Sequence, residues 1–177
     1  TLKGRGALSN HQGRFARNER VPDLEALAAA AATATEDEPE ETPKLATTLR
    51  IDQARTIIAR NRSPDIPFEQ SVNAYRGCEH GCVYCYARPS HAFLDLSPGL
   101  DFETRLFAKP NAAELLRAEL ARPGYACAPM ALGTNTDPYQ PVEREWRITR
   151  AVLEVLAACE HPFTIVTKGA LVERDLD

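Results

Sequence analysis

Arg76-Gly-Cys-Glu-His-Gly-Cys-Val-Tyr-Cys-Tyr-Ala-Arg-Pro-Ser-His91 is the stretch around which the rest of the chain is organised. Its cysteines, Cys78, Cys82 and Cys85, follow the spacing C-x3-C-x2-C. Three thiols this close together cannot all pair as disulfides, and soft sulfur ligands at such spacing are typical of a metal or iron–sulfur site. The stretch therefore predicts that these three cysteines are metal ligands.

The other two cysteines, Cys127 and Cys159, lie far downstream in apolar stretches, where we expect buried core thiols. Three thiolates on a four-iron cluster leave one iron without a protein ligand, so an outside molecule can bind there. Catalytic zinc sites likewise leave one coordination position open, whereas structural zinc sites fill all four with protein ligands. A structural zinc site of the Cys3His type, with His80 or His91 as the fourth ligand, explains the same three cysteines and stays open as the alternative.

The segments that flank the cysteines extend the pattern. They are Ser63-Pro-Asp-Ile-Pro-Phe68, Asn73-Ala-Tyr-Arg-Gly-Cys78, Cys85-Tyr-Ala-Arg-Pro-Ser-His91, Gly133-Thr-Asn-Thr-Asp-Pro-Tyr-Gln-Pro-Val-Glu143 and Ile165-Val-Thr-Lys168. With these segments, and with Tyr84 directly before the third cysteine, the chain resembles the radical SAM enzymes. Within them it is similar to the spore photoproduct lyase-like, "DNA repair photolyase" branch, over the residues from Ser63 to the end.

The resemblance implies a 4Fe-4S cluster held by Cys78, Cys82 and Cys85, and S-adenosyl-L-methionine bound at the open iron. The cluster would donate one electron, and the sulfonium would break to give methionine and a 5′-deoxyadenosyl radical that abstracts hydrogen from a substrate. An electron donor of the flavodoxin or ferredoxin type is implied as a partner. Nucleic acid repair or modification is implied as one candidate activity, with the substrate itself open.

The resemblance also suggests which residues bind the cofactor. Tyr84 would pack near the adenine, although a plain core aromatic is an equal alternative. Lys168 would pair with the cofactor carboxylate, against the alternative of a solvated strand-end lysine. Thr134, Asn135 and Asp137 follow a predicted strand and would meet the cofactor or the substrate, whereas Asp137 could equally be only a turn residue.

One departure from the branch concerns the substrate. Spore photoproduct lyases use a cysteine just ahead of the aspartate that follows their second strand. Here the corresponding stretch is Thr134-Asn-Thr-Asp137, which contains no thiol. We therefore expect a substrate other than spore photoproduct.

The composition is that of an ordinary globular protein. The chain has 177 residues, of which 44% are hydrophobic and 26% charged, with a formal net charge of −4. No apolar run approaches the roughly 20 residues that cross a bilayer. Cysteines clustered in one loop suit a reducing compartment, so we expect a cytoplasmic protein without a membrane partner.

The chain divides into two parts in the sequence. Residues 1–45 are expected to be a flexible arm and linker. Within them, 1–20 is basic and either contacts nucleic acid or is simply solvated, 23–34 favours a short helix, and 35–43 is an acidic, proline-containing linker. Residues 46–177 are expected to be the N-terminal part of a radical SAM barrel.

Hydrophobic periodicity in the second part alternates between strands and helices. The predicted strands are 70–75, 101–107, 125–134 and 163–167, and the predicted helices are 53–59, 87–94, 111–122 and 143–159, with a further helix beginning in the last ten residues. This order predicts an α/β fold with a parallel sheet. The resemblance implies a partial (β/α) barrel, of which only about the first three βα units are present.

Overall fold

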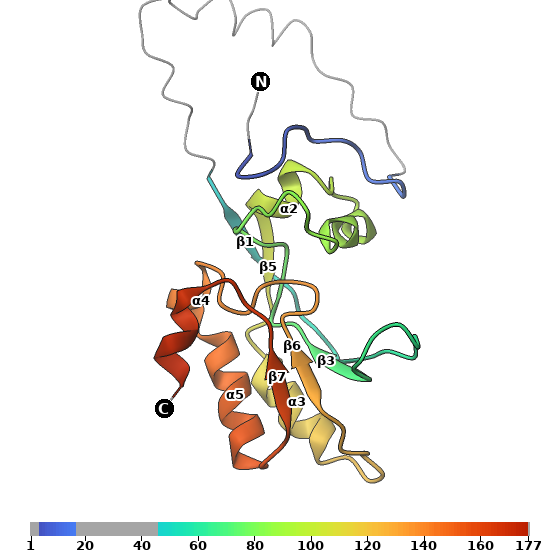
Figure 1. Ribbon diagram of the computed structural model, residues 1–177, viewed down its shortest axis with the longest axis vertical. Coiled ribbons are helices and arrows are strands. Elements are labelled where there is room, and N and C mark those ends of the chain that lie inside the picture. Colours follow the sequence, from blue (N-terminus) through green and yellow to red (C-terminus); the bar gives the residue numbers. More distant parts are fainter. Residues whose placement is uncertain (1–3, 17–45, 177) are drawn as a thin grey trace, which may run out of the picture.

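The computed structural model describes residues 4–16 and 46–176 (Figure 1). Within these residues the fold is mixed α/β, with one three-stranded and one four-stranded sheet, and neither sheet closes on itself. The predicted α/β class is therefore confirmed at this level. The predicted helix 23–34 and the acidic linker 35–43 lie outside the described residues.

The four-stranded sheet contains the three parallel strands that the sequence predicted. Its order is β2-β3-β6-β7, with the bounds β2 (Ile58–Arg60), β3 (Gln70–Val72), β6 (Met130–Leu132) and β7 (Phe163–Ile165). β3 pairs in parallel with β6, and β6 pairs in parallel with β7. All residues of β3 and β6 are buried, as expected for strands covered on both faces.

The sheet is nevertheless mixed, because β2 runs antiparallel to β3. The sequence predicted a helix at 53–59 here, and that prediction is wrong. Adjacent β-branched residues, Ile57 and Ile58, favour extended backbone. The side chain of Ile57 enters the core, and its N–H donates to the Glu119 carboxylate over 2.6 Å.

The three-stranded sheet has the order β1-β5-β4, with the bounds β1 (Thr48–Ile51), β4 (Tyr75–Arg76) and β5 (Arg105–Ala108). β1 is parallel to β5, and β4 is antiparallel to it. The predicted strand 70–75 is thus divided between the sheets, β3 in one and Tyr75 in the other. The predicted strand 101–107 is wrong in its first half, where α2 (Leu100–Thr104) precedes β5.

Helices α3 (Ala112–Leu120) and α5 (Ile148–Ala158) are the crossover connections of the parallel strands, and they lie side by side next to β6 and β7 (Figure 1). The main core is formed between them and the sheet. Its fully buried members include Leu116, Met130, Val152 and Leu156. The helical periodicity placed Leu116, Val152 and Leu156 on the buried faces correctly. It also placed Trp146 and Cys159 in the buried stripe of the helix predicted at 143–159, and both are exposed.

The predicted helix 143–159 is divided into α4 (Glu143–Trp146) and α5 by Arg147, whose φ of 49° is left-handed. Two shorter 3-10 helices, η1 (Arg88–Leu94) and η2 (Ala170–Asp175), occupy the segments predicted as helix at 87–94 and at the end of the chain. The left-handed residue ends α4 after one turn, so Trp146 remains 39% exposed rather than joining the buried stripe.

The two downstream cysteines are not core thiols, contrary to the sequence prediction. Cys127 and Cys159 are both exposed. Cys127 lies in the irregular stretch before β6, which begins later than predicted, and Cys159 is the residue that ends α5. Their sequence neighbours Ala126 and Ala158 are exposed as well, so the apolar composition of these two stretches does not mark buried segments.

The N-terminal segment predicted as a flexible arm contacts the folded part of the chain where the structure describes it. Residues 4–16 pack along α2 and η1 (Figure 1), with Ala7 only 7% exposed and Phe15 stacked on Phe93 at 5.0 Å between ring centroids. The segment thus makes contacts that its sequence did not predict, and its flexibility stays a prediction. Residues 17–45 lie outside the described part of the chain.

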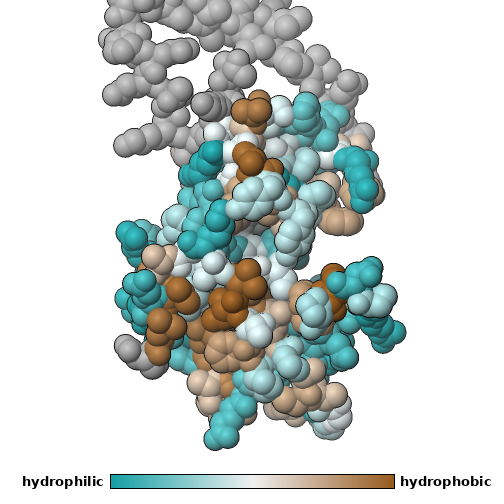
Figure 2. Space-filling view, in the orientation of Figure 1, coloured by the Kyte–Doolittle hydropathy of each residue, from teal (hydrophilic) through white to brown (hydrophobic). Residues whose placement is uncertain are grey.

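β7 forms one edge of the four-stranded sheet. Apolar side chains beside it are exposed, including Phe163 at 41% and Val166 at 68%. Figure 2 shows hydrophobic residues gathered on the face that carries β7 and the adjoining C-terminal segments.

In the described residues, no helix has the length and apolarity that crossing a membrane requires.

We expect Leu116→Ala to lower the free energy of unfolding by about 2–5 kcal/mol, because Leu116 is fully buried between α3 and α5. Urea unfolding followed by circular dichroism measures the change. Leu8→Ala is the matched control, because Leu8 is 78% exposed and its truncation leaves no cavity. Equal effects of the two substitutions would contradict the assigned core.

Candidate functional site

The carboxyl ends of β3, β6 and β7 open into one pocket of about 340 Å³. This follows from parallel pairing, since the segments that leave parallel strands emerge at the same edge of a sheet. All eight residues that the sequence analysis selected line this pocket: Cys78, Cys82, Tyr84, Cys85, Thr134, Asn135, Asp137 and Lys168. They come from three segments that lie far apart in the sequence, and the parallel strands bring these segments to one edge of the sheet.

The cysteine loop, residues 77–86, supplies the three thiols. Gly77 and Gly81 have positive φ values of 76° and 61°, a backbone region that disfavours other residues, so the loop can turn tightly around its cysteines. The N–H of Cys85 donates to the carbonyl of Cys82 over 3.2 Å. The Cys78 N–H donates to the carbonyl of Phe102 over 2.9 Å, which fastens the start of the loop to α2.

The three thiols differ in burial. Cys78 is 7% exposed, whereas Cys82 and Cys85 are half-buried. Burial raises the pKa of Cys78 to about 11, so this thiol is protonated at neutral pH, and a metal that binds it must displace the proton. Within the described residues, no group of three or more His, Cys, Asp or Glu side chains converges on the position of a single metal ion.

Lys168 and Tyr84 close one side of the pocket. The Lys168 ammonium donates to the Tyr84 hydroxyl over 2.7 Å and to the Cys82 sulfur over 3.4 Å. The hydrogen bond to Tyr84, followed by that to Cys82, raises the pKa of Lys168. Tyr84 is 74% exposed and is therefore not a core aromatic. Lys168 is exposed as well, but its charged end contacts the pocket wall instead of being fully solvated.

Asp137 joins the end of β6 to the end of β7. Its carboxylate accepts from the Thr167 hydroxyl over 2.6 Å and from the Lys168 backbone N–H over 2.7 Å. It also accepts from the Tyr139 N–H over 2.8 Å, the local bond of an aspartate turn. The nearest nitrogen of His80 lies 3.4 Å from the same carboxylate. Asp137 is thus both a turn residue and the residue that positions Lys168.

Three further residues shape the site, although the sequence analysis did not select them. The Asn73 side chain bonds the Thr134 hydroxyl over 3.1 Å and the Asn135 N–H over 2.9 Å. The fully buried Gln140 amide contacts Gly77, Glu79 and Thr136, and the Tyr86 hydroxyl donates to the Thr134 carbonyl. Asn73 was missed because the predicted strand 70–75 enclosed it, whereas β3 ends at Val72 and Asn73 follows it. Gln140 carries no comparable signal in the sequence.

His91 does not belong to the site. It is fully buried, packs edge-to-face on Phe102, and bonds the Arg105 carbonyl over 2.9 Å. Burial lowers its pKa. It does not line the pocket of the three thiols, so the zinc alternative loses one of its two possible fourth ligands. His80 does line that pocket.

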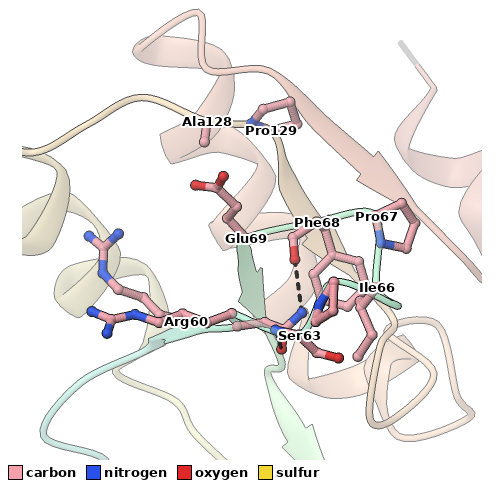
Figure 3. A pocket seen from close by; sticks show the side chains of 11 residues that line it. Arg60, Ser63, Ile66, Pro67, Phe68, Glu69, Ala128 and Pro129 are labelled. Carbon is pink, nitrogen blue, oxygen red and sulfur yellow. Dashed lines mark hydrogen bonds between the residues drawn. The ribbon is translucent and has the colours of Figure 1, made fainter.

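A second hollow, of about 670 Å³, lies at the opposite, amino-terminal edge of β3 and β6. It is formed by the loop that joins β2 to β3 and by the residues before β6. Figure 3 shows Glu69 and Arg60 on its rim with Phe68 and Pro129 beside them. The cysteines and the polar residues after β6 and β7 do not line it, so we assign the chemistry to the thiol pocket.

Comparison with known proteins gives relatives without an assigned activity. Uncharacterized protein Mb2609c of Mycobacterium bovis and uncharacterized protein Rv2578c of Mycobacterium tuberculosis are each 48% identical over 121 residues, which cover 67% of this chain and 36% of each relative. Uncharacterized protein MJ0683 of Methanocaldococcus jannaschii is 26% identical over 106 residues, covering 60% of this chain and 38% of that protein. The chain therefore spans little more than a third of the length of these curated relatives. No family model and no solved structure matches it.

Lys109 makes the stability of the site dependent on pH. Its ammonium donates to the carbonyl of Asn73 over 2.9 Å. Burial, followed by the nearby Arg76 guanidinium, lowers the pKa of Lys109 to about 8, below its usual value of about 10.4 in an unfolded chain. Between these two pH values the unfolded chain binds more protons than the folded one, so the free energy of unfolding must rise with pH.

We expect the wild type to gain stability relative to Lys109→Met on the order of 1–2 kcal/mol between pH 7.5 and pH 10. Urea unfolding of both proteins across this range measures the difference, and the variant serves as the reference for all other titrating groups. Parallel pH profiles would show that Lys109 keeps its ordinary pKa in the fold.

Proposed function

We propose that the chain is the N-terminal part of a radical SAM enzyme of the spore photoproduct lyase-like branch. One observation carries the proposal. The three cysteines of the C-x3-C-x2-C loop share a pocket with Thr134, Asn135, Asp137 and Lys168 at the carboxyl edge of three parallel strands. The fold and the motif thus support the same site independently of each other.

The finer architecture follows from the same strands. β3, β6 and β7, joined by crossovers that contain α3 and α5, are the arrangement expected of the first three βα units of a partial (β/α) barrel. On this proposal residues 46–177 are the beginning of that barrel. β1, β2, β4 and β5 are then additions around it.

The residues fit a four-iron cluster better than a single zinc ion. Zinc requires four ligands that converge on one point at about 2.0–2.3 Å, and the described residues contain no such group. A cluster places each thiolate on a different iron, so three thiols need only face one pocket. Cys78, Cys82 and Cys85 would hold the cluster. When bound, the cluster and S-adenosyl-L-methionine together supply reductive cleavage and hydrogen abstraction.

The remaining residues of the pocket would bind and orient the cofactor. Lys168 offers an ammonium group beside Cys82, where it would pair with a carboxylate. Asp137 accepts the Lys168 backbone N–H and so fixes the segment that carries this ammonium. Tyr84 would present its exposed ring to the adenine. Val166 and Ala87 line the pocket with apolar surface, which would help to exclude water from the reacting groups once the cofactor is bound.

The partners and the substrate of the whole protein are part of the same proposal. The branch resemblance implies a flavodoxin- or ferredoxin-type electron donor, a cytoplasmic location and nucleic acid as the candidate substrate class. In the basic N-terminal segment, one of the arginines that could contact phosphate groups of nucleic acid already bonds groups of the protein. Arg5 is engaged by the protein itself, through the Glu103 carbonyl at 2.6 Å and the Thr47 hydroxyl at 2.9 Å.

We expect anaerobic reconstitution with iron and sulfide to give about four iron atoms per chain, and the reduced protein to show an electron paramagnetic resonance signal that shifts when S-adenosyl-L-methionine is added. Cys82→Ala should lose most of the iron. Cys159→Ala is the matched control, because Cys159 is an exposed thiol outside the pocket, and it should behave as the wild type. Tightly bound zinc without a cluster would overturn the proposal in favour of a non-catalytic Cys3His module.

In Lys168→Met we expect the concentration of S-adenosyl-L-methionine that gives half of the shift in that signal to rise by about tenfold or more. The reason is that an ammonium–carboxylate hydrogen bond contributes roughly 1.5–3 kcal/mol to binding. The variant should still bind a normal amount of iron, since Lys168 is not a ligand. Lys168→Arg keeps the charge and should retain part of the effect. An unchanged titration in Lys168→Met would remove the carboxylate role of Lys168.

A further inference from the structure

Residues 4–16, here called the strap, lie against the cysteine loop. Figure 1 shows the strap in blue beside α2. The Leu100 N–H donates to the Ser9 carbonyl over 3.2 Å, and the side chain of Asn10 bonds both the carboxylate and the N–H of Asp101 at 3.2 and 3.0 Å. The strap is thus anchored on the helix directly beneath the loop.

The strap and the loop meet backbone to backbone at two glycines. A Cβ atom added at Gly6 would lie 1.8 Å from the carbonyl oxygen of Gly81. A Cβ atom added at Gly81 would lie 2.5 Å from the Cβ of Arg5. No other residue fits at either position without moving one segment away from the other, so the contact depends on the absence of both side chains.

A chain of buried polar groups continues this contact to the central cysteine. The Gly6 N–H donates to both carboxylate oxygens of Glu103, at 3.2 and 3.1 Å, and Glu103 is fully buried. The Arg88 guanidinium forms an ion pair with the same carboxylate and donates to the carbonyl of Cys82 over 3.0 Å. The strap is thus linked through Glu103 and Arg88 to the carbonyl of Cys82.

Arg5 makes a second connection, next to the first cysteine. Its guanidinium lies 3.5 Å from the carboxylate of Glu79, the residue that follows Cys78, and donates to the Glu103 carbonyl. Glu79 also accepts from the Thr47 hydroxyl over 2.7 Å. Strap residues therefore contact the loop at Glu79 and at Gly81, two of the three residues between Cys78 and Cys82.

The strap has little part in the main core. None of its described residues belongs to the hydrophobic cluster between the sheet, α3 and α5. Its contacts concentrate on the cysteine loop, α2 and η1. Release of the strap should therefore loosen the loop and leave the stability of the core unchanged.

We propose that the strap is a positioning element that holds the cysteine loop in the form that presents its three thiols to one pocket. Gly6 and Arg5 act through Glu103 and Arg88 on Cys82. The claim that the strap slows the loss of iron rests on the proposed function. The claim that the strap restrains the cysteine loop concerns the metal-free protein. The two claims can be tested separately.

The first test measures amide hydrogen exchange of the metal-free protein by mass spectrometry. Gly6→Ala forces the strap from Gly81, and a second variant lacks residues 1–8. We expect exchange in residues 78–88 to accelerate roughly tenfold, the effect of losing one or two hydrogen bonds, while exchange in 130–132 stays unchanged. Leu8→Ala, at an exposed strap position, is the control and should match the wild type. Unchanged exchange in the loop in both variants would overturn the proposal.

The second test measures the rate at which reconstituted protein loses iron to an excess of a ferrous chelator. We expect both strap variants to release iron several-fold faster than the wild type and Leu8→Ala, with the same iron content at the start. Faster exchange combined with unchanged iron release would overturn the positioning role. A wild type that forms no cluster would overturn the proposed function, and the exchange measurement would still decide whether the strap holds the loop.

Discussion

The parallel pairing of β3, β6 and β7 is the constraint on which the rest of the structure depends. Each strand is only three residues long, but all three end at the same edge of the sheet. The segments that follow them carry the thiols, the Thr134–Asp137 turn and Lys168. A shift of one residue in the register would turn every side chain of the shifted strand to the other face and would separate these groups. Asn73 and Asp137 reinforce the register, because each bonds across from one strand end to the next.

Much of the fold could be predicted because the main elements carry strong periodic signals. The parallel strands and the buried residues Leu116, Val152 and Leu156 of α3 and α5 came from apolar patterning of this kind. The failures have local physical causes. A helix was predicted where Ile57 and Ile58 instead extend the chain into β2, since pairing with β3 outweighs a short helical pattern. The break at Arg147 in the predicted helix 143–159 depends on a left-handed residue whose sequence gives no warning.

The candidate site was predictable to the extent that its residues form a contiguous motif or follow a strand. The cysteines satisfied the first condition, and Asp137 and Lys168 the second. Gln140 satisfied neither, because its role depends on a buried position facing Gly77. The strap was missed for a different reason. Arginines in a glycine-rich terminus suggest a solvated arm, and only the tertiary structure reveals that Arg5 pairs with Glu79 and that Glu103 is covered by Gly6.

The contact between Gly6 and Gly81 also restricts how the sequence can drift over generations. Neither glycine leaves room for a side chain, because a Cβ at Gly6 would meet the carbonyl oxygen of Gly81 and a Cβ at Gly81 would meet the Cβ of Arg5. A substitution at one position thus has no compensating substitution at the other. Gly6 and Gly81, which are 75 positions apart in the chain, are therefore each expected to resist substitution, and the N-terminal segment shares the mutational constraint of the cysteine loop.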